Sequence, residues 1–590
     1  MLEAQHEIHE AGHGESKWLD LMNAIGEIIE NTSRENANIG NSPSAKMLQI
    51  ASSASREYYL DRVIPDDIAC AHRNGDIHIH DLGYYGKTLT CVHIPLGRLL
   101  AEGFDTGHGY VRPPKRPASA AALAAIIIQS CQNDMHGGQS FAHFDTDMGP
   151  YMEGFDEDEA YQGMEAFIYN LNTMHSRAGA QVPFSTVNIG CDTSAGGRRV
   201  TRLLLEAYER GLGRGETPVF PNIIFRVKSG VNMNPKDPNY DLFKLACRVC
   251  ARRMNPTFSF MDSSFNAPYG DEVAYMGCRT RVMANRRGQE TSVGRGNLSF
   301  TTINLPRLAL MAGGNVDRFF RLLDTKLELV YRQLLHRFDI QSRLKVRDMP
   351  FLMGQKIYID SYGLGENDEI GPAIANGTLS VGFIGLAETL TVLCGAHHGE
   401  NEEAEQLGRE IVSFMRRQID GFAEESNLNF TLLATPAEGL SGRFVAIDRE
   451  RFGTVRNVTD REYYTNSFHL PVRYPTTISR KLVVEGAFHG LTNAGHISYV
   501  ELSSPPIENG EAVESIVKAM ARADMGYGGI NFPIDECRKC GHAGVIESSC
   551  PSCGSGDISR IRRITGYLAP LDRFNDAKKR ELEERVPHGN

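Results

Sequence analysis

The chain has 590 residues, of which 41% are apolar and 23% charged, and its formal net charge is −11. This length exceeds the roughly 250–300 residues at which one hydrophobic core stops growing, so we expect more than one domain. The acidic balance argues against a protein that coats nucleic acid, and no run approaches the ~20 apolar residues of a membrane span. The N-terminus lacks the basic-then-apolar pattern of a signal peptide, which predicts a cytoplasmic protein.

The pattern along most of the chain predicts an α/β architecture. Residues 17–62 place apolar side chains at helical spacing, and the apolar run 118–128 predicts a buried helix. Further on, β-branched runs alternate with amphipathic helices, which is typical of an open α/β sheet or a barrel. The expected strands are 184–190, 221–227, 298–305 and 379–386, and the expected helices include 317–337 and 403–420.

After about residue 530 the composition becomes rich in cysteine, glycine and serine, which marks a domain boundary. The stretch "CRKCGHAGVIESSCPSC" carries two C-x-x-C pairs, each followed by glycine. Such pairs bring four thiolates around Zn²⁺, and a closed four-thiolate site is structural because no position remains for water. We therefore predict that Zn²⁺ is bound by Cys537, Cys540, Cys550 and Cys553; four unrelated cysteines are the weaker alternative.

The other cysteines are less informative when taken singly. Cys247 and Cys250 form a C-x-x-C in a helical pattern without a partner pair, which favours buried structural thiols, and the same interpretation covers Cys70, Cys131 and Cys191. Three more cysteines border loops: Cys91, Cys278 in "AYMGCRTRV" and Cys394 in "GLAETLTVLCG". Each alone would more often be a core thiol than a reactive one.

Several blocks in order carry a resemblance to a known family. They are "ENAN", "GDIHIHDL", "MGCR", "GRGNLSFTTINLPRLAL", "TPAEGLSGRF", "YYTNSFHLPV", "GHISYVEL", the paired cysteines, and "RRITGYL" followed by "RVPHG". From about residue 35 to the C-terminus the chain resembles the anaerobic (class III) ribonucleotide reductases, which are glycyl-radical enzymes. The resemblance implies a ten-stranded α/β barrel with a finger loop inside. It also implies reduction of ribonucleoside triphosphates to 2′-deoxyribonucleoside triphosphates.

The resemblance assigns roles to individual residues. Gly566 would carry a stable radical on its Cα, although a turn residue is the ordinary interpretation of a lone glycine; a planar radical centre leaves no room for a side chain. Cys278 would become the thiyl that takes the 3′ hydrogen of the ribose, and Cys91 would help to reduce the 2′ position. Asn297 matches an asparagine beside the ribose in formate-using members. Cys394 suggests instead a third thiol reduced by a thioredoxin-like protein, so the reductant stays open.

Two further blocks predict contacts with the substrate. In "TPAEGLSGR", Thr435 is expected to cap a helix and Glu438 to complete a capping box, so that Ala437 and the free N–H groups beside it bind phosphate. An ordinary capped helix is the alternative. His78 and His80 alternate along a predicted strand and therefore face one side, where they border the active site or make structural hydrogen bonds.

The resemblance also implies partners and a division of the chain. A separate activase with a 4Fe–4S cluster and S-adenosylmethionine would install the radical, dNTP or ATP effectors would bind near 129–145, and the protein would be a homodimer without membrane or nucleic-acid partners. The predicted segments are an N-terminal helical part (1–62) too short for an ATP-cone, the barrel (63–530), the zinc module (531–560) and the radical loop (561–590). The alternatives are another glycyl-radical enzyme of the formate-lyase or dehydratase type and, more distantly, a nucleic-acid-binding zinc ribbon.

Overall fold

The computed structural model describes residues 21–30 and 42–589. The "ENAN" block at 35–38 and most of the predicted helical segment before residue 42 therefore lie outside the described residues. No helix in the described part of the chain is long and apolar enough to cross a membrane.

The larger of two main sheets has seven strands in the order β14-β15-β8-β7-β6-β5-β2. The strands from β2 to β8 run parallel, β15 is antiparallel to β8, and β14 is parallel to β15. Their bounds are β2 (Val92–His93), β5 (Gln139–Phe141), β6 (Ser185–Ile189), β7 (Asn222–Val227), β8 (Thr257–Phe260), β14 (Ser498–Glu501) and β15 (Tyr527–Asn531). β6, β7 and β8 are buried along their whole length, as expected for parallel strands covered on both faces.

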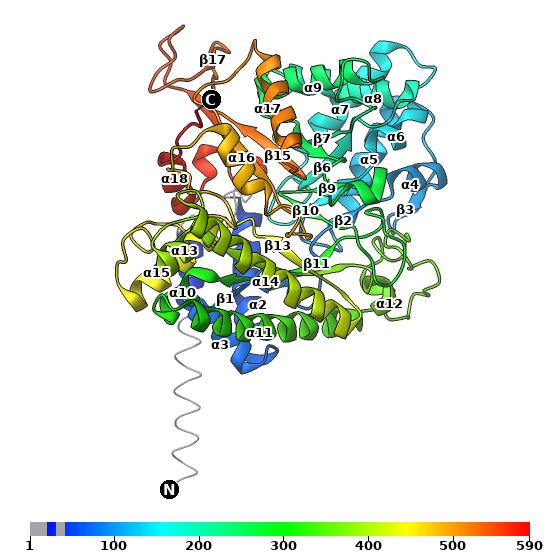
Figure 1. The fold of residues 1–590 in the computed structure, drawn as a ribbon. Coiled ribbons are helices and arrows are strands. Elements are labelled where there is room, and N and C mark those ends of the chain that lie inside the picture. Colours follow the sequence, from blue (N-terminus) through cyan, green and yellow to red (C-terminus); the bar gives the residue numbers. More distant parts are fainter. Residues whose placement is uncertain (1–20, 31–41, 590) are drawn as a thin grey trace.

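The second main sheet has four strands in the order β1-β11-β12-β13. β11, β12 and β13 are parallel, and β1 pairs with β11 in the antiparallel direction. Their bounds are β1 (Ile77–Ile79), β11 (Asn297–Asn304), β12 (Thr378–Ile384) and β13 (Asn429–Ala434). In Figure 1 this sheet lies below the seven-stranded one.

Helices cover the outer sides of both sheets. In Figure 1, α5, α7, α8, α9 and α17 lie over the larger sheet, and α10, α11, α13 and α14 lie over the smaller one. The helices are α2 (Pro43–Arg62), α3 (Asp66–Asn74), α4 (Leu96–Glu102), α5 (Pro117–Cys131), α6 (Phe144–Met148), α7 (Glu157–Thr173), α8 (Ala195–Arg210), α9 (Tyr240–Arg253), α10 (Leu305–Ala312), α11 (Val316–Ser342), α12 (Gly371–Ile374), α13 (Leu386–Cys394), α14 (Glu402–Ser426), α15 (Gly439–Phe452), α16 (Ile478–Gly486), α17 (Gly510–Arg522) and α18 (Asp576–Glu583). The strands and helices predicted from the sequence are therefore present, with ends that shift by a few residues.

A short hairpin lies between the two sheets, where Figure 1 labels β9 and β10. β9 (Tyr275–Met276) and β10 (Thr280–Arg281) are antiparallel, and Cys278 lies in the turn that joins them. Two backbone hydrogen bonds connect the smaller sheet to segments that precede strands of the larger one: the Cys91 N–H, just before β2, donates to the Asn297 carbonyl in β11 at 3.1 Å, and the Ala434 N–H in β13 donates to the Gly495 carbonyl, before β14, at 3.1 Å. The predicted α/β class is confirmed, whereas closure into one ten-stranded barrel stays a prediction.

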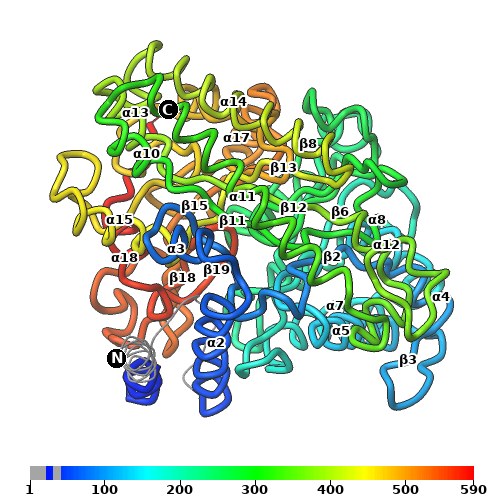
Figure 2. The backbone as a smooth tube through the Cα atoms, turned by 90° about the horizontal axis from the view of Figure 1, so that it is seen from below, coloured from blue at the N-terminus to red at the C-terminus, as the bar shows by residue number. Residues whose placement is uncertain are grey.

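The C-terminal part forms a separate four-stranded sheet in the order β17-β16-β18-β19. Its strands are β16 (Ile534–Cys537), β17 (Ala543–Gly544), β18 (Ile558–Arg563) and β19 (Leu568–Pro570), and one more antiparallel pair is β3 (Phe104–Asp105) with β4 (Tyr110–Val111). The predicted boundary between residues 560 and 561 falls inside β18. In Figure 2, β18, β19 and α18 lie on the same side of the molecule as α2.

Candidate active site

The turn between β18 and β19 places Gly566 directly against Cys278. A Cβ atom built on Gly566 would lie 2.4 Å from the Cα, 2.6 Å from the Cβ and 2.7 Å from the carbonyl oxygen of Cys278. No side chain fits into this space, so the close approach itself requires glycine at this position. Gly566 and Cys278, which come from two different sheets, are thus brought into contact.

Buried arginine and tyrosine side chains hold the carbonyl groups of this turn. Arg279 donates to the Thr565 carbonyl at 3.1 Å, and the Tyr499 hydroxyl donates to the same oxygen at 2.9 Å. Arg563 donates to the Gly566 carbonyl at 3.4 Å and to Asn531 Oδ1 at 2.9 Å. Sequence reasoning missed these residues, although Arg279 stands in the "MGCR" block and Arg563 in the "RRITGYL" block.

Glu438 also binds this turn. Its carboxylate accepts hydrogen bonds from the Thr565 hydroxyl at 3.3 Å and from the Tyr567 hydroxyl at 3.2 Å. The residues on both sides of Gly566 are therefore held by one carboxylate, which limits how the turn can move relative to Cys278.

The predicted helix cap at "TPAE" is wrong. Helix α15 begins at Gly439, Glu438 occupies the N-cap position, and no side chain caps the helix. Thr435 is fully buried at the end of β13, and its hydroxyl pairs with that of Thr302 at 2.9 Å. The Ala437 N–H already donates to Asn466 Oδ1 at 2.8 Å. Burial between the strands has turned Thr435 away from the helix, so its oxygen does not reach the first helical N–H groups.

Cys91 and Asn297 are neighbours on adjacent segments. The Asn297 N–H lies 3.4 Å from Cys91 Sγ. Asn297 Nδ2 donates to the Thr378 carbonyl, the Thr378 hydroxyl and the Ser380 hydroxyl at 3.2, 3.0 and 2.6 Å. Because a carbonyl oxygen accepts and never donates, the Thr378 carbonyl fixes the orientation of the amide. Asn297 Oδ1 is left buried without a partner in the structure, and a buried unpaired acceptor is typical of a site where a ligand donates.

The two candidate thiols are kept protonated. Burial raises the pKa of the Cys278 thiol to about 12, and the negative charge of Glu438 acts in the same direction. Burial also raises the pKa of Cys91 to about 12. A protonated thiol is the form that can give up a hydrogen atom, whereas a thiolate would favour nucleophilic chemistry.

His78 in β1 and His80 directly after it face the same side, as predicted. Their ring centres are 4.6 Å apart, His80 stacks on Phe300, and the Arg443 guanidinium lies 3.4 Å from His78 Nδ1. Burial lowers the pKa of His80 to about 3 and that of His78 well below its ordinary value. Both rings are therefore neutral at physiological pH, and Arg443 supplies the positive charge of this group.

Cys394 makes its hydrogen bonds with residues other than these. It ends α13, and its sulfur contacts the carbonyls of Leu390 at 3.2 Å and Ala396 at 3.5 Å. The hydrogen bonds of its thiol thus stay with its own helix and the turn that follows. Of the cysteines interpreted as core thiols, Cys131, Cys247 and Cys250 are buried and Cys191 is partly buried, whereas Cys70 is exposed on α3.

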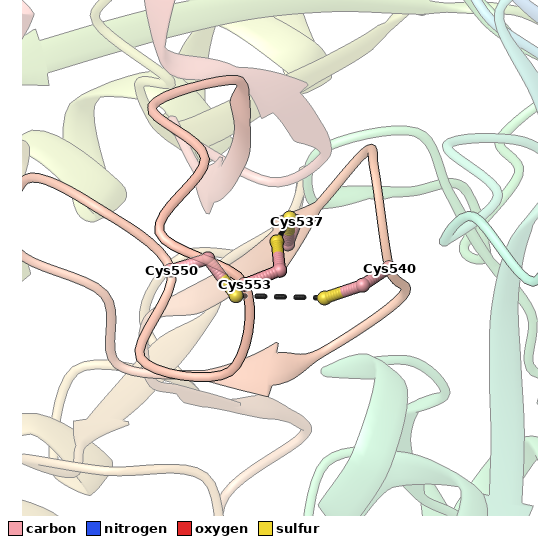
Figure 3. A group of neighbouring side chains, drawn as sticks. All are labelled: Cys537, Cys540, Cys550 and Cys553. Atoms are coloured by element: carbon pink, nitrogen blue, oxygen red, sulfur yellow. Dashed lines mark hydrogen bonds between the residues drawn. The ribbon is translucent and has the colours of Figure 1, made fainter.

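The four C-terminal cysteines converge as predicted. Figure 3 shows their thiols pointing toward one another, and all four sulfur atoms lie within 4.8 Å of each other. The Cys537 and Cys553 sulfurs are 3.6 Å apart, and those of Cys540 and Cys550 are 3.5 Å apart. Sulfurs ~2.3 Å from a tetrahedral Zn²⁺ are ~3.8 Å from each other, so this donor set fits such an ion.

The metal module and the Gly566 turn belong to one sheet. β16 ends at Cys537 and pairs along its length with β18, whose last residue Arg563 precedes the turn. A 2.8 Å ion pair between Arg562 and the buried Asp535 ties the same strands. A metal ion that holds β16 in place therefore also fixes the base of the turn.

The chain end closes over the turn. Arg585 donates to the carbonyls of Arg563 at 3.1 Å and Ile564 at 3.3 Å and pairs with Glu581 at 2.9 Å. Beyond it, the His588 N–H donates to the Glu501 carbonyl at 2.9 Å. Sequence reasoning assigned no role to Arg585, and only its place in the "RVPHG" block pointed to it.

Comparisons with known proteins agree with the resemblance. A family model described as anaerobic ribonucleoside-triphosphate reductase matches residues 35–588. The Escherichia coli K12 protein of that name is 33% identical over 583 residues, covering 91% of this chain and 81% of its own, and the phage T4 protein is 31% identical over 599 residues, covering 94% and 96%. A Thermotoga maritima anaerobic ribonucleotide reductase in complex with dATP and CTP superposes with a TM-score of 0.72 at 18% identity, covering 92% of each chain. Hydroxyproline dehydratase from Clostridioides difficile shares the fold at a TM-score of 0.68 and 10% identity, covering 96% of this chain and 89% of its own.

Proposed function

We propose a role for each site residue on the premise that this chain belongs to the anaerobic ribonucleoside-triphosphate reductase family. It is an oxidoreductase that reduces ribonucleoside triphosphates to 2′-deoxyribonucleoside triphosphates by glycyl- and thiyl-radical chemistry. The roles of individual residues, the metal, the reductant and the partners are our proposal.

The contact between Gly566 and Cys278 carries the proposal. The Cα radical of Gly566 takes the hydrogen atom from the Cys278 S–H group, which restores glycine and leaves a thiyl radical. The thiyl then takes the 3′ hydrogen of the ribose. When product forms, each hydrogen atom returns by the reverse path, so neither residue is consumed. The raised pKa of Cys278 supports this role, because only the thiol carries the hydrogen that is exchanged.

Cys91 and Asn297 serve the 2′ position. The Cys91 thiol, which is neutral at physiological pH, supplies a proton as the 2′ hydroxyl leaves as water, and a proton from solvent restores the thiol before the next turnover. The unpaired Oδ1 of Asn297 accepts a hydrogen bond from a ribose hydroxyl, because its amide nitrogen is already bound to Thr378 and Ser380. Asn297 is thus a binding group for the sugar rather than a source of protons.

The phosphate groups are placed beside the start of α15. Arg443 supplies positive charge there, and the neutral rings of His78 and His80 line the adjoining wall. Thr435, Ala437 and Glu438 act indirectly, since their polar groups already bind Thr302, Asn466 and the Gly566 turn. We therefore assign these three residues to positioning and assign the phosphates to Arg443 and the first backbone N–H groups of α15.

We propose formate as the reductant. Oxidation of formate to carbon dioxide supplies the two electrons that replace the 2′ hydroxyl by hydrogen. A thioredoxin-like protein would instead need a thiol pair at the site, and the Cys394 thiol makes its hydrogen bonds within α13 and the turn after it. Cys394 therefore receives no catalytic step.

The remaining components follow from the family. Zn²⁺ bound by the four C-terminal cysteines would stabilise the sheet that carries Gly566. A separate activase with a 4Fe–4S cluster and S-adenosylmethionine would generate the radical. The Thermotoga maritima relative was solved with dATP in a specificity site, and by analogy we propose dNTP or ATP effectors here. That the protein is a homodimer stays a proposal from the family resemblance. The cytoplasm stays the predicted location.

The experiment is anaerobic activation with S-adenosylmethionine and an activase, followed by electron paramagnetic resonance and a nucleoside-triphosphate turnover assay. We expect a doublet near the free-electron position and formate-dependent formation of deoxyribonucleotide, both absent in Gly566→Ala. A doublet without nucleotide turnover would indicate a different glycyl-radical enzyme. No doublet with an activase that is competent on a relative would reject the radical assignment.

A further inference from the structure

A small cavity lies beside Thr378, one of the hydrogen-bond partners of Asn297. Its volume is about 110 Å³, and its walls include Arg281, Arg416, Thr378, Thr431 and the exposed Ala284 and Gly490. A water molecule occupies ~30 Å³ of liquid, whereas ordinary ligand pockets span ~300 Å³ or more. The cavity therefore admits a few waters or a molecule of a few heavy atoms, and it excludes a nucleotide.

The described residues in the wall of this cavity include two positively charged side chains and no negatively charged one. Arg281 is only 4% exposed and donates to neutral oxygens, at 2.8 Å to Asn266 Oδ1 and 2.9 Å to the Phe265 carbonyl. Among the described residues no carboxylate lies within 4.0 Å of its guanidinium, while Arg416 pairs with Asp420 at 2.8 Å. Of the two guanidinium groups in the wall, only that of Arg416 is paired with a carboxylate. A buried cation without a counter-ion is costly, so an anion would stabilise this site.

Hydroxyl groups connect the cavity to Asn297. The Thr378 hydroxyl accepts from Asn297 Nδ2 at 3.0 Å, and Thr431 lies 3.0 Å from the Ser380 hydroxyl, which also binds that amide at 2.6 Å. The cavity wall is therefore connected to the residue that we place beside the ribose, directly through Thr378 and through Ser380 from Thr431.

We propose that this cavity binds a small monocarboxylate and holds it next to the active site. Formate is the occupant that fits, because it carries one negative charge and three heavy atoms and is the reductant in the proposed function, on which this inference rests. No bond forms or breaks in the cavity, which only raises the local concentration of the anion beside Thr378 and Thr431. Formate is oxidised after it reaches the ribose.

The test uses the full chain and three variants. Arg416→Gln removes a charge from the wall, and Ala284→Leu narrows the exposed mouth without touching a hydrogen bond. Arg417→Gln is the matched control, because it makes the same charge change at the next position of α14 on an exposed side chain. Binding of [¹³C]formate is followed by saturation-transfer NMR on the unactivated protein, and the KM values for formate and nucleotide are measured after activation.

We expect the Kd and KM for formate to rise about tenfold in Arg416→Gln, the change that follows from loss of one charge-assisted hydrogen bond. A smaller rise is expected in Ala284→Leu. The Arg417→Gln variant should match the wild type, and the KM for nucleotide and the radical yield should stay constant in all three. Equal formate binding in the wild type and in both cavity variants would overturn the proposal. Loss of formate binding in both variants would support the site. If nucleotide turnover at the same time did not depend on formate, only the assignment of formate as reductant would be rejected.

Discussion

Gly566 and Cys278 approach so closely that a Cβ atom on residue 566 would lie 2.4 Å from the Cα of Cys278, a separation that real Cβ atoms essentially never show. The neighbouring atom is backbone, which cannot move aside like the end of a long side chain. Glycine is therefore required by the space, and the planar radical that we propose at this position requires it as well.

We expect Gly566→Ala to abolish the radical signal and to displace the β18–β19 turn. Forcing a methyl group into packed backbone typically costs ~1–3 kcal/mol, so the midpoint of thermal unfolding should fall. Electron paramagnetic resonance and differential scanning calorimetry check the two effects separately.

Gly421→Ala is the control for this prediction. Gly421 lies inside α14, and a Cβ there would meet no atom within 4 Å. Alanine in an exposed helix interior should stabilise the protein by roughly 0.5–1 kcal/mol. If Gly566→Ala were stabilised as well, the contact with Cys278 would not exist in solution.

Loss of the proposed Zn²⁺ should loosen the Gly566 turn. We expect Cys540→Ser to lose zinc, measured by elemental analysis, and to reach a lower radical yield, because β16 and β18 share one sheet with the turn. Hydrogen exchange at residues 558–570 should also increase. Cys70→Ser, at an exposed thiol on α3, is the control and should match the wild type. A metal-free variant with full radical yield would argue against the coupling.

Sequence motifs within one short segment were enough to predict some parts of the site. Paired C-x-x-C motifs fix a tetrahedral thiolate site within one short segment, so spacing alone identified Cys537, Cys540, Cys550 and Cys553. The strands and helices followed from periodicity in the same way. Gly566 and Cys278 are far apart in the chain, and no periodicity links them; only the resemblance paired them before the fold did.

Predictions from local sequence patterns were wrong where burial determined which hydrogen bonds a side chain makes. "TPAE" has the composition of a helix start. Thr435 is nevertheless buried at the end of β13, and its hydroxyl pairs with that of Thr302 instead of capping the helix. Arg279 and Arg585 are just two of many arginines in the sequence, and their roles depend on which carbonyl groups the fold brings within reach. The sequence does not encode such contacts in any spacing.

Glu438→Gln should lower the pKa of Cys278. The carboxylate of Glu438 raises that pKa together with burial, so a neutral amide should increase the thiolate fraction at alkaline pH. We expect faster alkylation of Cys278 by iodoacetamide between about pH 9 and 10, followed by peptide mass spectrometry. Glu450→Gln, on an exposed side chain of the same helix α15, is the matched control. Identical alkylation profiles for both variants would contradict the predicted influence of Glu438.

Arg585→Gln should free the chain end from the turn. It removes donors to the carbonyls of Arg563 and Ile564 and leaves the buried Glu581 short of a partner. We expect a loss of about 1–3 kcal/mol in local stability, visible as faster hydrogen exchange at 563–567. Arg580→Gln breaks only an exposed pair with Glu583 on the same helix and should cost at most ~1 kcal/mol. Similar exchange in the two variants would show that Arg585 does not hold the turn.

Acid should destabilise the protein through its buried histidines, and His93 gives the clearest test. Both of its ring nitrogens are buried without partners, and burial, reinforced by His143 and Arg295, lowers its pKa from 6.5 to about 3. Since the unfolded chain takes up this proton first, the stability that neutral His93 contributes is complete above pH 6.5 and is lost as the pH falls toward 3. Between pH 7.5 and 5.5 one such histidine accounts for about 1.4 kcal/mol. His93→Phe should therefore lose about 1.4 kcal/mol less than the wild type over this interval, measured by urea unfolding at both pH values; parallel losses would mean that His93 is protonated in the folded protein.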